Sequence, residues 1–223
     1  GMAVALLPPW VYEGEREEVL QRLGSQETIN KCRGHFSDPT NYLLRLGGLD
    51  MFYLSSSIAH PELAGKNLVE IGEAFGCDPV EAVFRLVLAD GADFYNVMIR
   101  HVFAKSAELD RLLMNPYCSV ESDGVVTATD GLLSNFTMNR SSFGYTIRFI
   151  EEYVLHRNIF SLEEAIRKMT SLPADSAGLS NRGRIEVGKA ADLVVLDLEK
   201  LADNSTDEVP QAYPSGVELV VVN

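Results

Sequence analysis

The stretch GRIEVGKAADLVVLD, from Gly183 to Asp197, decides how we divide the chain. Its glycines mark turns, and Ala191 to Asp197 contains Leu193-Val194-Val195-Leu196, a run of branched aliphatic residues of the kind found in strands. A second run of this kind, Val217 to Val222, closes the sequence. We therefore expect residues 183–223 to form part of a small β-domain, separate from residues 1–182.

Upstream, predicted strands alternate with predicted helices, which favours βα units on a parallel sheet and an α/β fold class. Before them, Pro8 and Pro9 predict an extended lead-in. The expected strands are 50–55, 94–99 and 117–120, and the expected helices are 13–23, 68–75, 79–88, 105–114, a segment around 149–154, and 162–169. A complete (β/α)8 barrel needs roughly 250 residues, so only three or four units fit in this chain.

Composition excludes several classes of function. The net charge is −13, from 19 basic and 32 acidic residues. Such an acidic chain repels phosphate backbones and gives no basic cluster for a membrane surface, so we expect neither nucleic acid nor membrane as a partner. Three widely spaced cysteines, Cys32, Cys77 and Cys118, suit free thiols in a reducing compartment. With no apolar run long enough to cross a bilayer, this predicts a cytoplasmic protein.

The strongest chemical signal is Ser122-Asp123-Gly124, directly after the strand expected at 117–120. In barrel enzymes, catalytic groups stand at the carboxyl ends of the strands. A carboxylate there can hold a metal ion and take a proton from metal-bound water. An Asp-Gly turn without any catalytic role is the alternative, and the neighbouring sequence decides between the two.

That neighbouring sequence resembles the N-acyl-D-amino-acid deacylases of the amidohydrolase superfamily. The resemblance lies in the order of Ser122-Asp123-Gly124, LEEAIRKMTSLPA at 162–174 and GKAADLVVLD at 188–197. Further matching segments are LPPW at 7–10, PELAGKNL at 61–68, DNST at 203–206 and YPSGV at 213–217. The resemblance implies that residues 1–182 form the last βα units of a TIM barrel, with a lid-like insertion near the N-terminus. It also implies part of a small β-sandwich domain over 183–223, and zinc-assisted hydrolysis of N-acyl-D-amino acids.

The resemblance also assigns site residues. Asp123 becomes a metal ligand and the general base that later protonates the leaving amine. The arginine that binds the substrate carboxylate falls on Arg140 if one residue is shifted, whereas an alignment without a gap places Ser141 there. A solvated loop arginine is the other interpretation of Arg140. Glu121 stands where the family has a small residue, and it either shares the face of Asp123 and raises a pKa or points away.

Most of the zinc ligands that this chemistry requires are missing. Catalytic zinc takes about three protein ligands, mostly histidine. None of the four histidines, His35, His60, His101 and His156, has the spacing of a His-x-His or His-Glu-x-x-His motif. His101, at the end of an expected strand, is the least unfavourable ligand. We therefore expect an incomplete zinc site and an inactive isolated chain.

Three functions remain in competition: a truncated or split deacylase, a non-catalytic fragment or assembly module of the same fold, and a cyclic-amide hydrolase of the dihydroorotase or hydantoinase type. Gly1-Met2 resembles a tag-cleavage scar before a native start, and both ends look cut relative to the family. A partial barrel exposes strand edges and apolar faces, so we expect self-association or pairing with a missing N-terminal half.

Overall fold

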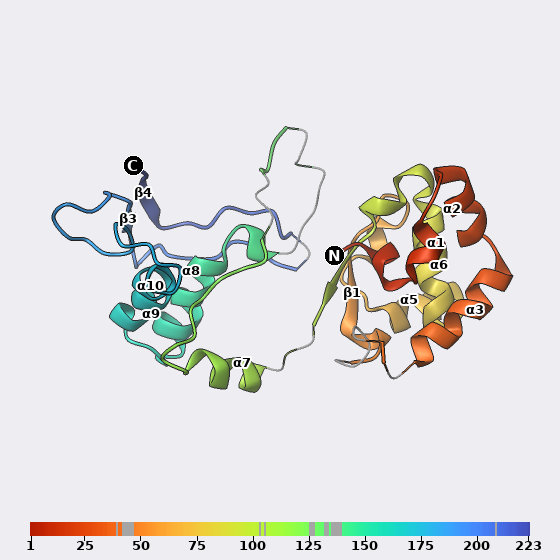
Figure 1. Ribbon diagram of the computed structural model, residues 1–223, viewed down its shortest axis with the longest axis horizontal. Helices are drawn as coiled ribbons and strands as arrows, with labels where there is room; N and C mark the ends of the chain where they lie inside the picture. Colours follow the sequence, from red (N-terminus) through yellow and green to blue (C-terminus); the bar gives the residue numbers. More distant parts are fainter. Residues whose placement is uncertain are drawn as a thin grey trace. The chain divides into compact units, whose positions relative to one another are not determined.

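A computed structural model describes residues 1–38, 40–41, 47–102, 104, 106–124, 128–131, 134, 140–207 and 209–223. The chain divides into two compact units, Gly1–Ala104 and Lys105–Asn223. Figure 1 draws the first in red to yellow-green and the second in green to blue. Across the described ranges, no helix combines the length and the apolar character needed to cross a membrane.

The first unit packs helices around one hydrophobic core. Its α-helices are α1 (Pro9–Tyr12), α2 (Arg16–Leu23), α3 (Gln26–Ser37), α5 (Leu68–Phe75) and α6 (Pro79–Ala89), with short 3-10 turns at Ala3–Leu6, Leu49–Met51, Pro61–Leu63 and Gly91–Asn96. Its strands are β1 (Phe52–Ser56) and β2 (Met98–His101). The core is drawn from the amino-terminal turn, α2, α5, α6 and both strands.

Local sequence signals explain the ends of α5 and α6. Asn67 and Glu70 form a reciprocal capping box at the start of α5. Gly76 ends that helix in the left-handed conformation, with φ +65°. The Asp78 side chain accepts hydrogen bonds from the amides of Val80 and Glu81, and so caps α6. These two helices therefore begin and end close to where the sequence predicts.

Three expectations for the earlier part of the chain differ from the structure. The Pro8-Pro9 segment is not extended, because Pro9 opens helix α1, where a missing N–H costs nothing. The strand expected at 94–99 begins later than predicted, because residues 91–96 form a 3-10 turn and β2 spans Met98–His101. The strands β1 and β2 pair antiparallel, Phe52 opposite His101, so the expected parallel arrangement is not found among the described residues.

The second unit holds the helices α7 (Ser106–Leu113), α8 (Tyr145–Ile150), α9 (Leu162–Met169) and α10 (Ser171–Ser176), a π-helical turn η7 (Glu151–His156) and a 3-10 turn η6 (Arg140–Ser142). Strands β3 (Leu193–Leu196) and β4 (Val217–Val221) form an antiparallel pair, and Figure 1 labels both of them near the carboxyl terminus. Tyr117–Val120, expected as a strand, belongs to no strand in the structure. The chain therefore has two compact units divided at residue 104, while the family-based division at residue 182 stays a prediction.

Candidate functional site

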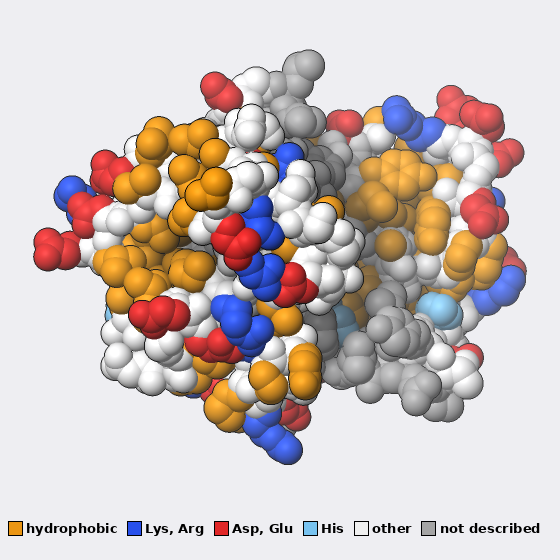
Figure 2. Space-filling view, turned by 60° about the vertical axis from the view of Figure 1, so that its left-hand side comes forward, with side chains coloured by type: hydrophobic (Ala, Val, Ile, Leu, Met, Phe, Trp, Pro, Cys, Tyr) orange, Lys and Arg blue, Asp and Glu red, His pale blue; other side chains and the backbone are white. Residues whose placement is uncertain are grey.

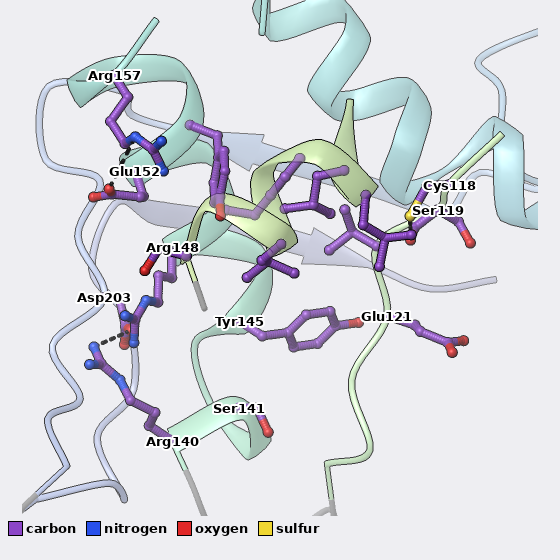
Figure 3. Close-up of a pocket in the computed structure, with 17 residues that line it drawn as sticks. Cys118, Ser119, Glu121, Arg140, Ser141, Tyr145, Arg148, Glu152, Arg157 and Asp203 are labelled. Carbon is purple, nitrogen blue, oxygen red and sulfur yellow. Dashed lines mark hydrogen bonds and ion pairs between the residues drawn. The ribbon is translucent and has the colours of Figure 1, made fainter. Parts of the chain in front are cut away.

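The second unit contains a cavity of about 660 Å³ between α7, residues 118–121, α8 and η7. One wall is apolar and is formed by leucines of α7 together with Val120 and Phe149. Figure 3 shows charged side chains gathered at the opposite end, namely Arg140, Arg148, Glu152, Arg157 and Asp203. Cavities of this size with an apolar wall and a few polar groups are typical of small-molecule sites.

Arg140 is held by an ion pair with Asp203. Its Nη2 lies 2.7 Å from Asp203 Oδ2 and also donates to the Ser205 carbonyl, while Nε donates to Ser205 Oγ. The Asp203 side chain is 2% exposed and accepts two further hydrogen bonds from the amide and hydroxyl of Ser205. Arg140 is therefore not a solvated loop arginine, and no motif or spacing in the sequence points to this partner 63 residues away.

Gly144 lets Asp203 reach this position. A Cβ atom at residue 144 would stand 2.4 Å from Asp203 Oδ1, far inside any tolerated contact. The Asp203 amide in turn donates to Glu151 Oε2. The segment 203–205 is thus fixed against both η6 and the start of η7.

The other two arginines of the cavity differ from each other. Arg157 donates to both carboxylate oxygens of Asp110 and lies over the Tyr153 ring. The same guanidinium lowers the pKa of Asp110, and burial raises the pKa of the Tyr153 hydroxyl. Arg148 is exposed and donates to no group in the described part of the chain. Arg140 and Arg157 are each paired with an aspartate, whereas Arg148 offers the cavity a guanidinium with no such partner among the described residues.

Asp123 is exposed and is not among the residues that line the cavity, whereas Glu121 is. Gly124 lies against the backbone of the Arg140 segment, since a Cβ atom there would be 3.1 Å from both Ser141 O and Ser142 Cα. The structure thus brings the two backbone segments that carry Asp123 and Arg140 side by side. It places Glu121, rather than Asp123, at the cavity wall.

A buried lysine braces the segment that leads to Asp123. Lys168 in α9 is fully buried, and its Nζ donates to the carbonyls of Asn115 and Cys118 at 2.7 and 3.0 Å. The amide of Val120 donates to the Lys168 carbonyl. Sequence reasoning missed this residue, because the helical pattern marks Lys168 as one more polar position.

The histidines are scattered. His60 contacts Glu62, and the exposed His156 lies 3.9 Å from Glu152. His101 stacks on Phe52 with ring centroids 4.0 Å apart, and burial lowers its pKa. His35 contacts Asn41. Each histidine therefore contacts a side chain of the described residues, and the four do not gather at one site.

The described residues do not fit a catalytic zinc ion. Among them, no three side chains of histidine, cysteine, aspartate or glutamate come close enough to bind one metal. Burial raises the pKa of Cys32 and Cys77, which disfavours the thiolate that a metal requires. A lone exposed Asp123 supplies one ligand where about three are needed.

Comparison with known proteins adds the context that this geometry lacks. Residues 93–222 match the model of the amidohydrolase family. N-acyl-D-glutamate deacylase of Alcaligenes xylosoxydans xylosoxydans is 34% identical over 179 residues, which cover 80% of this chain. A crystal structure of N-acyl-D-glutamate deacylase from Bordetella bronchiseptica, complexed with zinc and a phosphonate mimic of the tetrahedral intermediate, superposes with a TM-score of 0.62. It is 30% identical and covers 78% of this chain.

The chain spans about a third of the length of these relatives, 34% of each deacylase. A dihydroorotase of Ligilactobacillus salivarius (strain UCC118) also matches, at 30% identity, but over only 52% of this chain.

Proposed function

The chain belongs to the amidohydrolase family, and on that premise we propose that it is the carboxyl-terminal part of a zinc-dependent deacylase that acts on N-acyl-D-amino acids. The observation that carries the proposal is the extent of the deacylase match, 80% of the chain. The dihydroorotase match reaches only 52%, which favours a linear amide over a cyclic one as the substrate.

We propose further that residues 1–182 correspond to the last part of the family barrel and residues 183–223 to part of its small β-domain. The α/β fold of the structural relative supports this assignment. The antiparallel pairing of β1 with β2 shows that unit 1 itself is not a set of parallel strands within the described residues. Within residues 1–182, we therefore propose that the lid-like insertion lies in unit 1, Gly1–Ala104.

Within this function, Asp123 is the proposed metal ligand and general base. Its position on an exposed segment beside η6 leaves it accessible to ligands supplied from outside the described residues. Arg140 is the proposed partner of the substrate carboxylate. Its Nε and Nη2 are engaged, but Nη1 donates to none of the described residues and the side chain lines the cavity.

The isolated chain should neither bind zinc tightly nor hydrolyse substrate, because one carboxylate cannot replace a set of three ligands. A non-catalytic assembly module is the alternative that the scattered histidines favour.

Two measurements test the proposal. Elemental analysis after zinc loading and desalting should find well under one zinc ion per chain, and N-acetyl-D-glutamate should not be hydrolysed. An Asp123→Asn variant should retain as little zinc as the unaltered chain. Stoichiometric zinc together with turnover, both lost in Asp123→Asn, would show that the chain builds its own metal centre.

A further inference from the structure

Asp203 is anchored by groups other than Arg140. Its amide donates to Glu151 Oε2 at 2.9 Å, and its Oδ1 accepts from the amide and the hydroxyl of Ser205 at 3.0 and 2.6 Å. Gly144 leaves room for this carboxylate, and its second oxygen, Oδ2, receives Arg140. The position of the carboxylate is therefore set by its own segment and its neighbours, and the guanidinium of Arg140 is held against it.

The contacts of Arg140 use two of its three nitrogens. Nε donates to Ser205 Oγ at 3.3 Å, and Nη2 donates to Asp203 Oδ2 and to the Ser205 carbonyl at 2.7 and 2.5 Å. Figure 3 draws the ion pair with Asp203 as a dashed line. A guanidinium carries five N–H donors, of which two belong to Nη1. Because the side chain also lines the cavity, Nη1 is the nitrogen that a carboxylate in the cavity can reach.

Burial distinguishes this ion pair from others in the second unit. Arg184 and Asp175 have side chains that are 37% and 56% exposed, and Figure 2 shows acidic and basic side chains on the face of the unit that it brings forward. Exposed pairs of this kind contribute little, because water and salt screen them. The side chain of Asp203 is only 2% exposed and that of Arg140 26%. Their hydrogen bonds can therefore hold the guanidinium in one geometry.

A fixed guanidinium favours ligand binding. An arginine side chain has many rotamers, and ordering them costs free energy. If the side chain is ordered when the protein folds, a ligand does not have to order it on binding.

We propose that Asp203 is a positioning residue for Arg140. It holds the guanidinium through Nη2, while Ser205 holds Nε, so that Nη1 receives the carboxylate of the substrate. This inference rests on the proposed function, in which Arg140 binds that carboxylate. It gives residues 203–205, which lie in the proposed β-domain part of the chain, a function in the substrate site.

The first test needs no ligand. Nuclear magnetic resonance detects the Nε–H of Arg140, and its signal is identified by its loss in Arg140→Lys. Asp203→Asn keeps the shape of the side chain but has one oxygen where the carboxylate has two, so exchange of this proton with water should accelerate by about tenfold or more. Ser205→Ala removes the acceptor of Nε without changing any charge, and it should have the same effect.

The second test compares two ligands in the same spectra. N-acetyl-D-isoglutamine differs from N-acetyl-D-glutamate by an amide in place of the α-carboxylate. We expect the unaltered chain to prefer the carboxylate, and Asp203→Asn to reduce this preference by about tenfold. A purely structural effect would instead weaken the binding of both ligands equally.

Asp197→Asn is the matched control. It removes an ion pair of the same carboxyl-terminal segment, that of Asp197 with Lys200 at 2.6 Å, and should change neither proton exchange nor ligand preference. Circular dichroism verifies that each variant is folded, and if Asp203→Asn is not, Ser205→Ala decides.

The possible results separate this inference from the proposed function. An unaltered chain without any preference for the carboxylate would contradict both, because Arg140 would then not bind it. A preference that is as strong in Asp203→Asn and Ser205→Ala as in Asp197→Asn would overturn the positioning by Asp203 alone. Unchanged proton exchange in both variants would overturn it as well.

Discussion

Replacing Lys168 by methionine should destabilise the second unit by about 2 kcal/mol. The change keeps the volume of the side chain but removes the ammonium that donates to Asn115 O and Cys118 O. A buried carbonyl that loses its donor costs roughly 1–3 kcal/mol. We take about 1 kcal/mol, the lower end of this range, for each of the two carbonyls. Asn115 and Cys118 are incompletely buried, so their carbonyls can accept hydrogen bonds from water instead. Removing the buried charge of Lys168 has the opposite, stabilising effect, so we do not expect a larger total loss of stability.

Urea unfolding followed by far-ultraviolet circular dichroism measures this change, and a loss of about 2 kcal/mol lowers the midpoint by roughly 1 M. The protein supplies an internal reference, since its one tryptophan, Trp10, lies in the first unit and should report an unshifted transition. Lys200→Met removes an ammonium that is 69% exposed and should cost less than about 0.5 kcal/mol. If Lys168→Met lowers the free energy of unfolding no more than Lys200→Met does, the hydrogen bonds of Lys168 do not stabilise the segment that leads to Asp123.

Two further changes test the packing and the pH response. Gly144→Ala should cost about 1–3 kcal/mol in urea unfolding, because the new methyl meets an Asp203 side chain that three hydrogen bonds hold in place. Gly34→Ala, in open space within α3, should instead stabilise by up to about 1 kcal/mol, and equal effects at both sites would contradict the close approach. Burial lowers the pKa of His101, so the unfolded chain binds more protons, and stability should fall as pH drops below about 6.5. Unfolding midpoints of the first unit between pH 7.5 and 5 should therefore depend less on pH in His101→Gln than in the exposed-residue control His156→Gln; parallel profiles would rule out His101 as the source.

Signals confined to a few neighbouring residues predicted structure well. The run from Gly76 to Glu81 fixed the end of one helix and the start of the next, because a left-handed glycine and an aspartate before proline each act on their own backbone. By contrast, α3 escaped prediction, since Ile29 and Cys32 are almost its only buried apolar side chains. The contacts of Glu81 with Arg33 and Arg85 likewise follow from no local signal.

Contacts between distant residues were beyond what spacing can reveal. The pairing of β1 with β2 joins Phe52 to His101, and nothing in either strand states its direction. The role expected for Arg140 depended on the family alone, whereas its actual neighbour is Asp203. That aspartate was noted in the sequence only as part of a matching segment. A buried carboxylate with three donors is visible only once the fold brings them together.

Folding and catalysis make separate demands on this chain. Each unit has its own hydrophobic core, and the second is further stabilised by the buried hydrogen bonds of Asp203 and Lys168. Hydrolysis needs about three ligands around one ion, and the described residues offer Asp123 without a neighbouring histidine. On the proposed function, a stable scaffold would present Asp123, and the remaining ligands would come from residues outside that scaffold. We therefore expect zinc binding to increase when a polypeptide that carries the remaining ligands is added, and not when zinc alone is added.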